Sequence, residues 1–356
     1  MAAKQVSGGD IYVKKLIEDS NEKFDVVLSD NAKRILTGVN IGKLHVTDSE
    51  SSKGNIGIAR LYLSRIVSSL RFIRKNQAKY STVISSSPFI YDVLPAIFTK
   101  NENRAVIIFH LLPKRKGASL STRIRFFLAY VEQKASLYLI RKYFKIILAG
   151  NQELKDELKK KFPNKKIIIS HAGIDITEID DIEEQKKDPN LGIFVGRLTV
   201  QKGILDLVDI VKAIEKEKPK FKLIIIGDGP DKQLLKKKIN REGLKSISFA
   251  GFVDKDTKYK LMKEAKFFIF PSREEGWGIA LAEALYCQCL CFCYELPHYR
   301  GLFASYPLYV ALDDSKELSR RVITHYDMSP KPAQQKFIKQ YDHKLVVEDV
   351  FRQIND

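Results

Sequence analysis

Two doubly wound α/β domains are the fold that this sequence predicts. The chain has 356 residues, 44% of them are hydrophobic, and short β-branched runs alternate with helix-length segments in two successive series. A domain of roughly 150 residues is common, so two domains suit the length. Apolar strands joined by long connections are typical of parallel sheets with crossover helices. Wholesale disorder is excluded because the apolar content is enough for sizeable cores.

Each series of runs predicts one sheet. The expected strands are residues 24–28, 82–85, 105–109, 145–149 and 166–170 in the first series, and 191–195, 221–226, 246–250, 266–270, 290–294 and 308–311 in the second. The polar stretch 178–190 is expected to be a linker. We therefore expect a first domain at 1–182, a second at 190–328, and a helical tail at 329–356 that packs back on the first domain.

Positive charge is concentrated in one part of the chain. The 61 Lys and Arg residues outnumber the 43 Asp and Glu residues, giving a formal net charge of +18. Residues 51–150 hold 18 basic and only three acidic side chains, so they account for +15. Such a patch indicates an anionic partner: nucleic acid, an anionic membrane surface or a phosphorylated substrate.

Two segments of this basic region, 57–79 and 121–143, have the pattern of amphipathic helices. The sequence leaves open whether they lie on an anionic membrane or form core helices with solvated basic faces. No apolar run reaches the roughly 18 to 20 residues that cross a bilayer. No cleavable signal peptide is recognised either, so a cytoplasmic location is expected.

All four cysteines lie within residues 287–293. Four are too few for a disulfide scaffold and suit a reducing cytosol. In a strand, alternation places Cys291 and Cys293 on one face, where free cysteines usually behave as small buried hydrophobes.

Candidate phosphate-binding residues follow the first strand of the second domain. Gly196 and Arg197 come directly after strand 191–195, and Lys202 with Gly203 precedes a helical pattern. Ligands of open α/β sheets bind at this edge, and exposed helix N–H groups beside two cations suit a diphosphate. Ordinary solvated loop cations are the alternative interpretation.

Two carboxylates, Glu275 and Glu283, stand eight residues apart after strand 266–270. Eight residues is slightly over two helical turns, so both face one cleft if the helix begins near Gly276. Gly276 and Gly278 let a ligand approach the backbone closely. Glu283 has apolar neighbours, and a buried acid needs a partner: a sugar hydroxyl, a ribose diol or a structural ion pair.

Together these motifs resemble the donor domain of retaining glycosyltransferases of family four, which have the two-Rossmann GT-B fold. They are Gly-Arg-Leu-x3-Lys-Gly at 196–203, Ile-Ile-Gly-Asp-Gly-Pro at 225–230, Gly-Phe-Val at 251–253 and Glu-Gly-Trp-Gly within Glu-x7-Glu at 275–283. No single motif is specific, whereas the ordered set is. The resemblance extends more weakly over the whole chain and implies two Rossmann-like domains that face a central cleft.

The resemblance also implies a role for each matching residue. Arg197 and Lys202 bind the donor diphosphate, Glu275 touches the transferred sugar, and Glu283 binds the ribose. Val253 lies by the nucleobase. The implied donor-binding set is Gly8, Gly9, Gly196, Arg197, Lys202, Val253, Glu275, Gly276, Trp277, Gly278 and Glu283, and the implied catalytic set is His110, Arg197, Lys202 and Glu275.

Three of these candidates, Gly8, Gly9 and His110, lie in the first domain. Gly8 and Gly9 precede a helical run from Ile11 and resemble the Gly-rich loop that closes over the donor phosphate, since glycines before a helix can present amides to a phosphate. Only six residues come before this motif, so a short or missing first strand is expected. His110 follows strand 105–109 and matches the family's histidine near the transferred sugar. Without the resemblance, a satisfied structural histidine is the simpler interpretation.

Three other patterns favour structural roles. Asp254-x-Asp256 resembles a metal motif, but it opens a helix, where capping is the better explanation. Gly227-x-Gly229 lacks the third glycine of a dinucleotide site. Asn151 is expected to cap the helix that follows it. No metal and no cofactor are therefore expected beyond the sugar nucleotide itself.

The leading hypothesis is a metal-independent retaining glycosyltransferase, peripheral on the cytoplasmic face of the membrane. It would transfer a sugar from a nucleotide-diphosphate-sugar to a lipid-phosphate or glycan acceptor, with basic residues 51–150 meeting the anionic surface. A non-catalytic sugar-nucleotide-binding subunit is the second hypothesis. A basic nucleic-acid-binding protein is the third, but a nucleic-acid partner is not expected because no aromatic-basic recognition module is present.

Overall fold

The computed structural model describes residues 8–29, 33–47, 55–76, 80–100, 103–109, 111 and 120–356. The chain divides into two compact α/β units, one of residues 1–172 with 343–356 and one of residues 173–342. These boundaries differ from the expected 1–182, 190–328 and 329–356. The first unit stops at Ala172, and of the expected tail only the last helix belongs with it.

The first unit is built on a four-stranded parallel sheet in the order β3-β4-β5-β6. These strands are Val83–Ser85, Arg104–Ile108, Ile146–Ala149 and Lys166–Ile169. Every residue of β4 and β5 is buried, as expected for parallel strands covered on both faces. A separate pair joins β1 (Val26–Ser29) to β2 (Leu44–Thr47). β2 is missing from the predicted strands because it is short and half exposed, so its sequence contains no apolar run.

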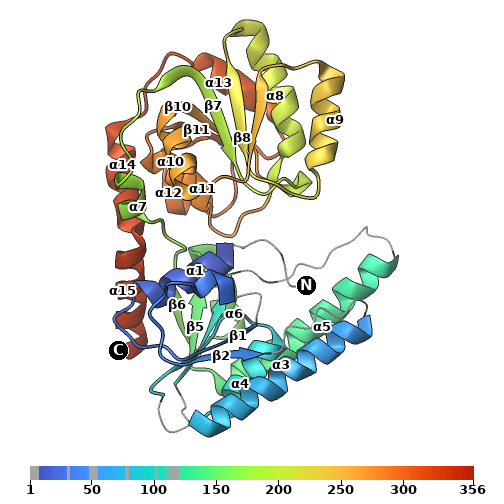
Figure 1. Ribbon diagram of the computed structural model, residues 1–356, viewed down its shortest axis with the longest axis vertical. Coiled ribbons are helices and arrows are strands. Elements are labelled where there is room, and N and C mark those ends of the chain that lie inside the picture. Colours follow the sequence, from blue (N-terminus) through green and yellow to red (C-terminus); the bar gives the residue numbers. More distant parts are fainter. Residues whose placement is uncertain are drawn as a thin grey trace. The chain divides into compact units, whose positions relative to one another are not determined.

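Helices cover both faces of this sheet (Figure 1). Val106 and Ile108 of β4 pack in one cluster with α4 (Ile90–Ile97) and α5 (Leu120–Tyr143). The alternate residues Ala105 and Ile107 pack on the opposite side. There they meet Tyr12 and Leu16 of α1 (Gly8–Glu18) and Val347 and Val350 of α15 (His343–Asn355). The two-residue period of the strand thus separates two helical layers.

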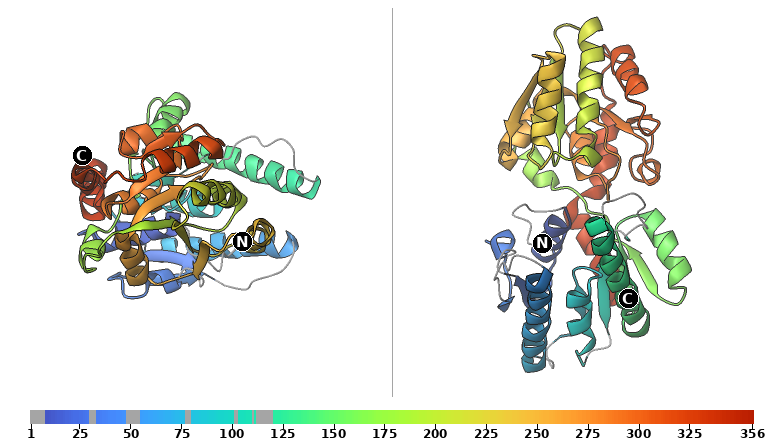
Figure 2. Two further views of the ribbon diagram at one scale, coloured as in Figure 1. Left: turned by 90° about the horizontal axis from the view of Figure 1, so that it is seen from above. Right: turned by 90° about the vertical axis from the view of Figure 1, so that its right-hand side faces the viewer.

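α4 lies between α3 (Asn55–Asn76) and α5, and contacts both (Figure 2, right). α3 and α5 confirm that the segments 57–79 and 121–143 are helical, but α5 exposes Phe127, Val131 and Tyr138, so it lacks the clean apolar face that was expected. α6 (Gln152–Lys161) begins at Asn151, whose side chain accepts a hydrogen bond of 2.8 Å from the Leu154 amide, so the predicted cap is confirmed.

The second unit contains a six-stranded parallel sheet in the order β12-β11-β10-β7-β8-β9. In chain order the strands are β7 (Asp188–Val195), β8 (Lys222–Ile226), β9 (Ile247–Gly251), β10 (Ala265–Phe270), β11 (Leu290–Tyr294) and β12 (Leu308–Val310). All six predicted strands are therefore confirmed, with ends shifted by no more than three residues. Every residue of β11 is buried.

The helices of this unit are α7 (Ile176–Asp180), α8 (Ile204–Glu217), α9 (Lys232–Glu242), α10 (Lys255–Glu264), α11 (Ile279–Tyr286), α12 (Tyr299–Phe303), α13 (Ser315–Thr324) and α14 (Pro332–Ile338). α8 packs against both α9 and α13 (Figure 1). Asp254 caps α10 by accepting a 2.8 Å hydrogen bond from the Thr257 amide, which confirms capping as its role. All four cysteines are buried, and burial raises the pKa of each thiol.

The polar stretch 178–190 is part of the second unit, so its interpretation as a linker is wrong. α7 and the start of β7 lie within it. Lys187 Nζ donates to the carbonyl oxygens of Met262, Ala265 and Cys287 at 3.1, 2.7 and 2.8 Å. Backbone carbonyls from distant parts of the chain therefore hold this stretch on the sheet, which polarity alone does not reveal.

Lys187→Met is expected to lower the free energy of unfolding of the second unit by about 2 kcal/mol, since buried carbonyl oxygens lose their donor while the side-chain volume is kept. Urea denaturation followed by the fluorescence of Trp277 measures it, because this single tryptophan is buried in the same unit. Lys216→Met, at an exposed position on α8, is the matched control. Equal unfolding midpoints for the two variants would contradict the prediction.

Candidate functional site

The candidate site lies at the carboxyl ends of β7 and β10 in the second unit. The strand order reverses at this point. β8 and β9 lie on one side of β7, whereas β10, β11 and β12 lie on its other side. Open α/β sheets bind ligands at such a point. The segment after β7 carries Gly196 and Arg197, and the segment after β10 carries Glu275 and Gly276. Sheet order thus brings together two motifs that lie far apart in the sequence.

The turn after β8 supports the turn after β7. Gly227 has φ +133°, and a Cβ on it would stand 1.9 Å from the Gly196 carbonyl oxygen. The Leu198 amide donates to the Asp228 carbonyl at 3.0 Å. Gly227-x-Gly229 is therefore a packing motif that fixes the backbone beneath Arg197. The Arg197 side chain itself is exposed.

Lys202 connects the two loops. It ends a short 3₁₀ turn, Val200–Lys202, and its Nζ lies 2.6 Å from Glu275 Oε1 and donates to the Glu274 carbonyl at 3.2 Å. Gly203 has φ +67°, and a Cβ there would lie 1.8 Å from the Pro271 carbonyl oxygen, so the backbones are in contact. The structure thus brings the predicted diphosphate-binding lysine directly onto the predicted sugar-binding glutamate.

The helix does not begin near Gly276, the condition under which the spacing of Glu275 and Glu283 was expected to turn both to one cleft. α11 begins at Ile279, after Gly278, so Glu275 belongs to the preceding loop. Glu283 is buried, and its Oε1 accepts hydrogen bonds from Lys258 Nζ at 2.8 Å and Tyr259 OH at 3.0 Å. Of the partners considered for Glu283, this structure contains the ion pair. Its donors come from α10, and nothing in the local sequence of α11 indicates them.

Trp277 anchors the loop from the inside. It is buried and packs edge-to-face on Phe303 and Tyr341, with ring centroids 5.6 and 5.3 Å apart. Only its backbone is therefore placed to meet a ligand. The neighbouring Gly276 faces open space where a Cβ would stand.

β9 ends at the same edge of the sheet, and the segment that follows it begins there. Val253 is half buried, and Phe252 beside it is 87% exposed. The sequence motif selected Val253, and the structure leaves its role beside the nucleobase a prediction.

The structure describes Gly8 and Gly9 of the first unit but not the third candidate there, His110. α1 begins at Gly8, so Gly8 and Gly9 are the first residues of the helix and not a loop ahead of Ile11. Asp10 in this first turn favours the helix start electrostatically. The amides of a first turn have no partner within the helix, so the two glycines can still present them. His110 and residues 1–6, where the short or missing first strand was expected, lie outside the described residues.

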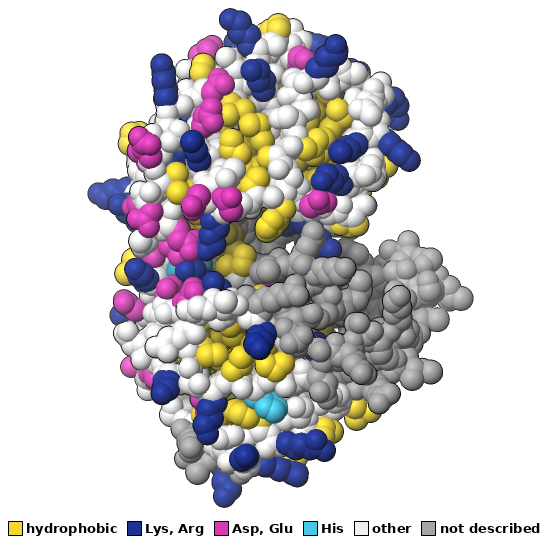
Figure 3. All heavy atoms as spheres, in the orientation of Figure 1, with side chains coloured by type: hydrophobic (Ala, Val, Ile, Leu, Met, Phe, Trp, Pro, Cys, Tyr) yellow, Lys and Arg dark blue, Asp and Glu magenta, His cyan; other side chains and the backbone are white. Residues whose placement is uncertain are grey.

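α3 and α5 each carry an exposed stripe of apolar and basic side chains. On α3 it consists of Leu63, Val67, Arg71, Arg74 and Lys75, and on α5 of Phe127, Val131, Lys134, Tyr138 and Arg141. Phe127 and Tyr138 are 64% and 65% exposed, so they are not core residues. The acid of α5, Glu132, turns to α4 and accepts from the Ile90 amide at 3.2 Å. Lys and Arg side chains also gather at the lower end of this unit in Figure 3.

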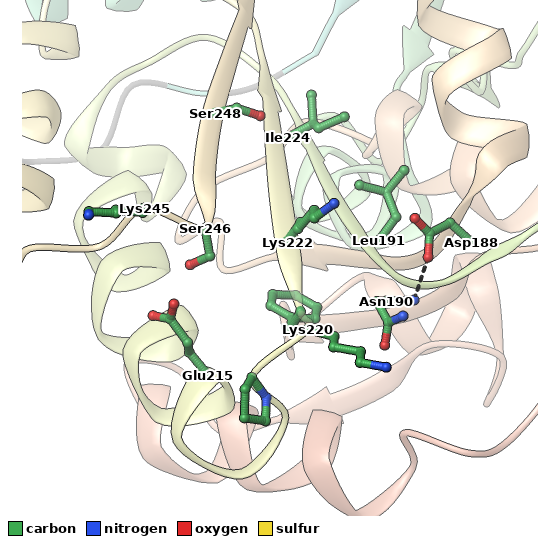
Figure 4. Close-up of a pocket in the computed structure, with 12 residues that line it drawn as sticks. Asp188, Asn190, Leu191, Glu215, Lys220, Lys222, Ile224, Lys245, Ser246 and Ser248 are labelled. Atoms are coloured by element: carbon green, nitrogen blue, oxygen red, sulfur yellow. Dashed lines mark hydrogen bonds between the residues drawn. The ribbon is translucent and has the colours of Figure 1, made fainter.

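A cavity of about 490 Å³ lies where β7, β8 and β9 begin, at the edge of the sheet opposite the candidate site. Figure 4 shows Glu215, Lys222, Lys245 and Ser246 around it, with the Asn190 amide bonded to Asp188. Ligands bind at carboxyl ends of strands in this class of sheet, so this cavity is not the candidate active site.

The described residues contain no group of three or more His, Cys, Asp or Glu side chains that would hold a metal ion. Within the same ranges, no helix has the length and hydrophobicity that crossing a bilayer requires.

Residues 175–342 match the family described as "Glycosyl transferases group 1". A glycosyltransferase of Methanocaldococcus jannaschii is 32% identical over 154 residues, 39% of each chain. The GDP-mannose:cellobiosyl-diphosphopolyprenol alpha-mannosyltransferase of Xanthomonas oryzae pv. oryzae is 26% identical over 167 residues, 44% of each. Alpha-monoglucosyldiacylglycerol synthase of Acholeplasma laidlawii is 36% identical over 117 residues, 33% of this chain and 29% of that protein. The matches therefore span less than half of each of these relatives.

Solved structures resemble both units. HepE of Anabaena, in complex with UDP and glucose, has a TM-score of 0.75 at 14% identity, over 99% of this chain and 97% of that one. TarM of S. aureus, in a complex that contains UDP, has a TM-score of 0.64 at 14% identity, over 82% of this chain and 59% of that one. The protein thus has the GT-B glycosyltransferase fold, which confirms the predicted fold class.

Proposed function

We propose that the protein is a retaining glycosyltransferase that uses a nucleotide-diphosphate-sugar and needs no metal ion. The contact between Lys202 and Glu275 carries the proposal, because it joins a cation and a carboxylate from two loops at the ligand-binding edge of the sheet. The family match over residues 175–342 covers both loops.

In the proposed reaction, Arg197 and Lys202 stabilise the charge that develops on the departing diphosphate, aided by amides at the start of α8. Glu275 positions the sugar and Glu283 the ribose. The acceptor attacks the face of the sugar that the diphosphate leaves, and a diphosphate oxygen takes the acceptor's proton. The bond from the anomeric carbon to the diphosphate breaks as the bond to the acceptor oxygen forms, with no covalent enzyme intermediate.

A panel of labelled UDP- and GDP-sugars, incubated with the protein and membrane lipids from a bacterium, tests this proposal. Labelled lipid or glycan product is expected with one donor and unchanged yield in EDTA. Binding of UDP or GDP without hydrolysis or transfer indicates instead a non-catalytic subunit. Tight, salt-sensitive RNA binding with no response to sugar nucleotides supports the nucleic-acid alternative.

We also propose that the acceptor is a lipid-linked or glycan precursor at the cytoplasmic face of the membrane, reached through the exposed stripes of α3 and α5. Apolar side chains next to arginines and lysines are the composition that binds anionic lipid surfaces. α3 contains no acidic residue, and the only acid of α5 faces α4. Relatives whose names specify a diphosphopolyprenol or a diacylglycerol agree with such an acceptor.

Replacing Arg71, Arg74 and Lys134 together by glutamine is expected to weaken binding to vesicles of equal parts phosphatidylglycerol and phosphatidylcholine roughly 100-fold. Each cation near the surface contributes about 1 kcal/mol, so three contribute about 3 kcal/mol. Vesicle sedimentation measures it, and wild-type binding is expected to fall as salt rises. Glutamine at Lys216, Lys237 and Lys260, three exposed lysines of the second unit, is the control. Undiminished vesicle binding by the first triple variant would refute the docking surface.

A further inference from the structure

Arg273 lies between the two loops of the candidate site and bonds to both. Its backbone amide donates to the Gln201 carbonyl at 2.8 Å, and Nη1 donates to the Val200 carbonyl at 3.2 Å. Nη2 donates to Asp206 Oδ2 at 2.7 Å, and Nε to Asp313 Oδ1 at 2.5 Å. One side chain from the loop after β10 therefore holds the 3₁₀ turn that carries Lys202, the first turn of α8 and the segment after β12.

These bonds differ in strength. The Asp206 side chain is 16% exposed, and it also accepts a 2.7 Å hydrogen bond from Tyr294 OH. The Asp313 side chain is 59% exposed. Because solvent weakens exposed ion pairs, the bond from Arg273 to Asp206 contributes most of the connection.

Besides backbone contacts such as the bond from the Arg273 amide to Gln201, side chains join the loops in two ways, and only one of these uses residues of the proposed reaction. Lys202 and Glu275 form the first connection, and a bound donor would engage both of these side chains. Arg273, Asp206 and Tyr294 form the second and are assigned to no donor atom. When the donor engages Lys202, the second connection is the one that keeps the loops at a fixed spacing.

We infer that Arg273 is a positioning residue. It holds Lys202 and Glu275 at the distance from each other at which both side chains can contact the same donor molecule. This inference rests on the proposed function. It adds a residue outside the implied donor-binding set, whose partner Asp206 lies 67 positions earlier in the sequence.

Arg273→Gln is expected to weaken UDP or GDP binding at least about tenfold, because misplacing a binding group by about 1 Å has effects of this size or larger. The KM for the donor sugar nucleotide should rise equally while kcat stays within about threefold, the pattern of lost binding that ground and transition states share. Isothermal titration with UDP and with GDP, and steady-state kinetics, measure the two effects. Unchanged nucleotide affinity in a folded Arg273→Gln variant overturns the inference.

A graded series separates positioning from general damage to the fold. Asp206→Asn should match Arg273→Gln, whereas Asp313→Asn should change affinity less than about twofold because its bond is exposed. Arg273→Lys should recover part of the affinity, since an ammonium can pair with Asp206 but lacks the guanidinium's fork of donors. Arg320→Gln is the matched control, since Arg320 pairs at 2.6 Å with Glu317 within α13. Equal losses from Asp206→Asn and Asp313→Asn contradict the assigned roles.

Amide hydrogen exchange without ligand separates this inference from the proposed function. Residues 197–206 should exchange faster in Arg273→Gln than in the wild type, because this segment loses its two bonds to the Arg273 side chain, at Val200 and Asp206. Unchanged exchange in this segment overturns the positioning role. A wild type that binds none of UDP, GDP, ADP and dTDP overturns the proposed function, and the exchange result then still decides whether Arg273 holds the loops.

Discussion

Arg197→Ala is expected to lower kcat/KM for the donor sugar nucleotide about 1,000-fold while leaving the free energy of unfolding unchanged within about 0.5 kcal/mol. Removing one group that stabilises developing negative charge costs about 10² to 10³ in rate, and Arg197 is expected also to contribute to binding of the diphosphate. Stability should be spared because the side chain is exposed, and surface substitutions away from structural contacts have small effects.

Steady-state kinetics and urea denaturation on the same preparation test both halves of this prediction. Arg241→Ala is the control: it removes another largely exposed arginine of the same unit, at the end of α9. Full transferase activity in Arg197→Ala would remove the assignment of the diphosphate site. A drop in stability as large as the drop in activity would point to a structural role in the turn after β7.

The strands were predictable because burial leaves a direct mark on sequence. β5 and β11 are buried at every residue, so each is an uninterrupted apolar run. β2 is half exposed and lacks this mark. The stretch 178–190 misled the prediction for the opposite reason: Lys187 is polar and yet held inside by carbonyl oxygens 75 to 100 positions away. Local composition records burial but not such distant hydrogen bonds.

The sequence predicted some residues of the candidate site but not the partners that hold them. Motif order selected Lys202 and Glu275, and the sheet order then brought them together. The partners of Glu283 were not predictable, because Lys258 and Tyr259 lie on α10 and belong to no recognised motif. Arg273 stands two residues before the recognised motif at 275–283 and received no role, since its significance depends on Asp206 and Asp313, which only the folded sheet places beside it.

Glu275→Gln is expected to separate recognition of the sugar from recognition of the diphosphate. The amide keeps the size of the side chain but loses the charge that pairs with Lys202 at 2.6 Å. Transfer should fall about 100- to 1,000-fold, since a charged contact to the sugar in the transition state is lost. Affinity for free UDP or GDP should hold or increase, because neither ligand carries the transferred sugar and Lys202 no longer has a carboxylate competing for its ammonium.

Isothermal titration with UDP or GDP, whichever the wild type binds, and kinetics with the matching sugar nucleotide measure these opposite effects. Asp313→Asn, which also removes one carboxylate from the edge of the site, is the control and should change neither quantity more than about twofold. Suppose instead that nucleotide affinity falls in parallel with transfer. Glu275 would then act by holding Lys202 in place, and the contact with the sugar would have to come from another residue. The expected result requires the Arg273 bonds to keep the two loops together after the Lys202 pair is lost, so the two experiments constrain each other.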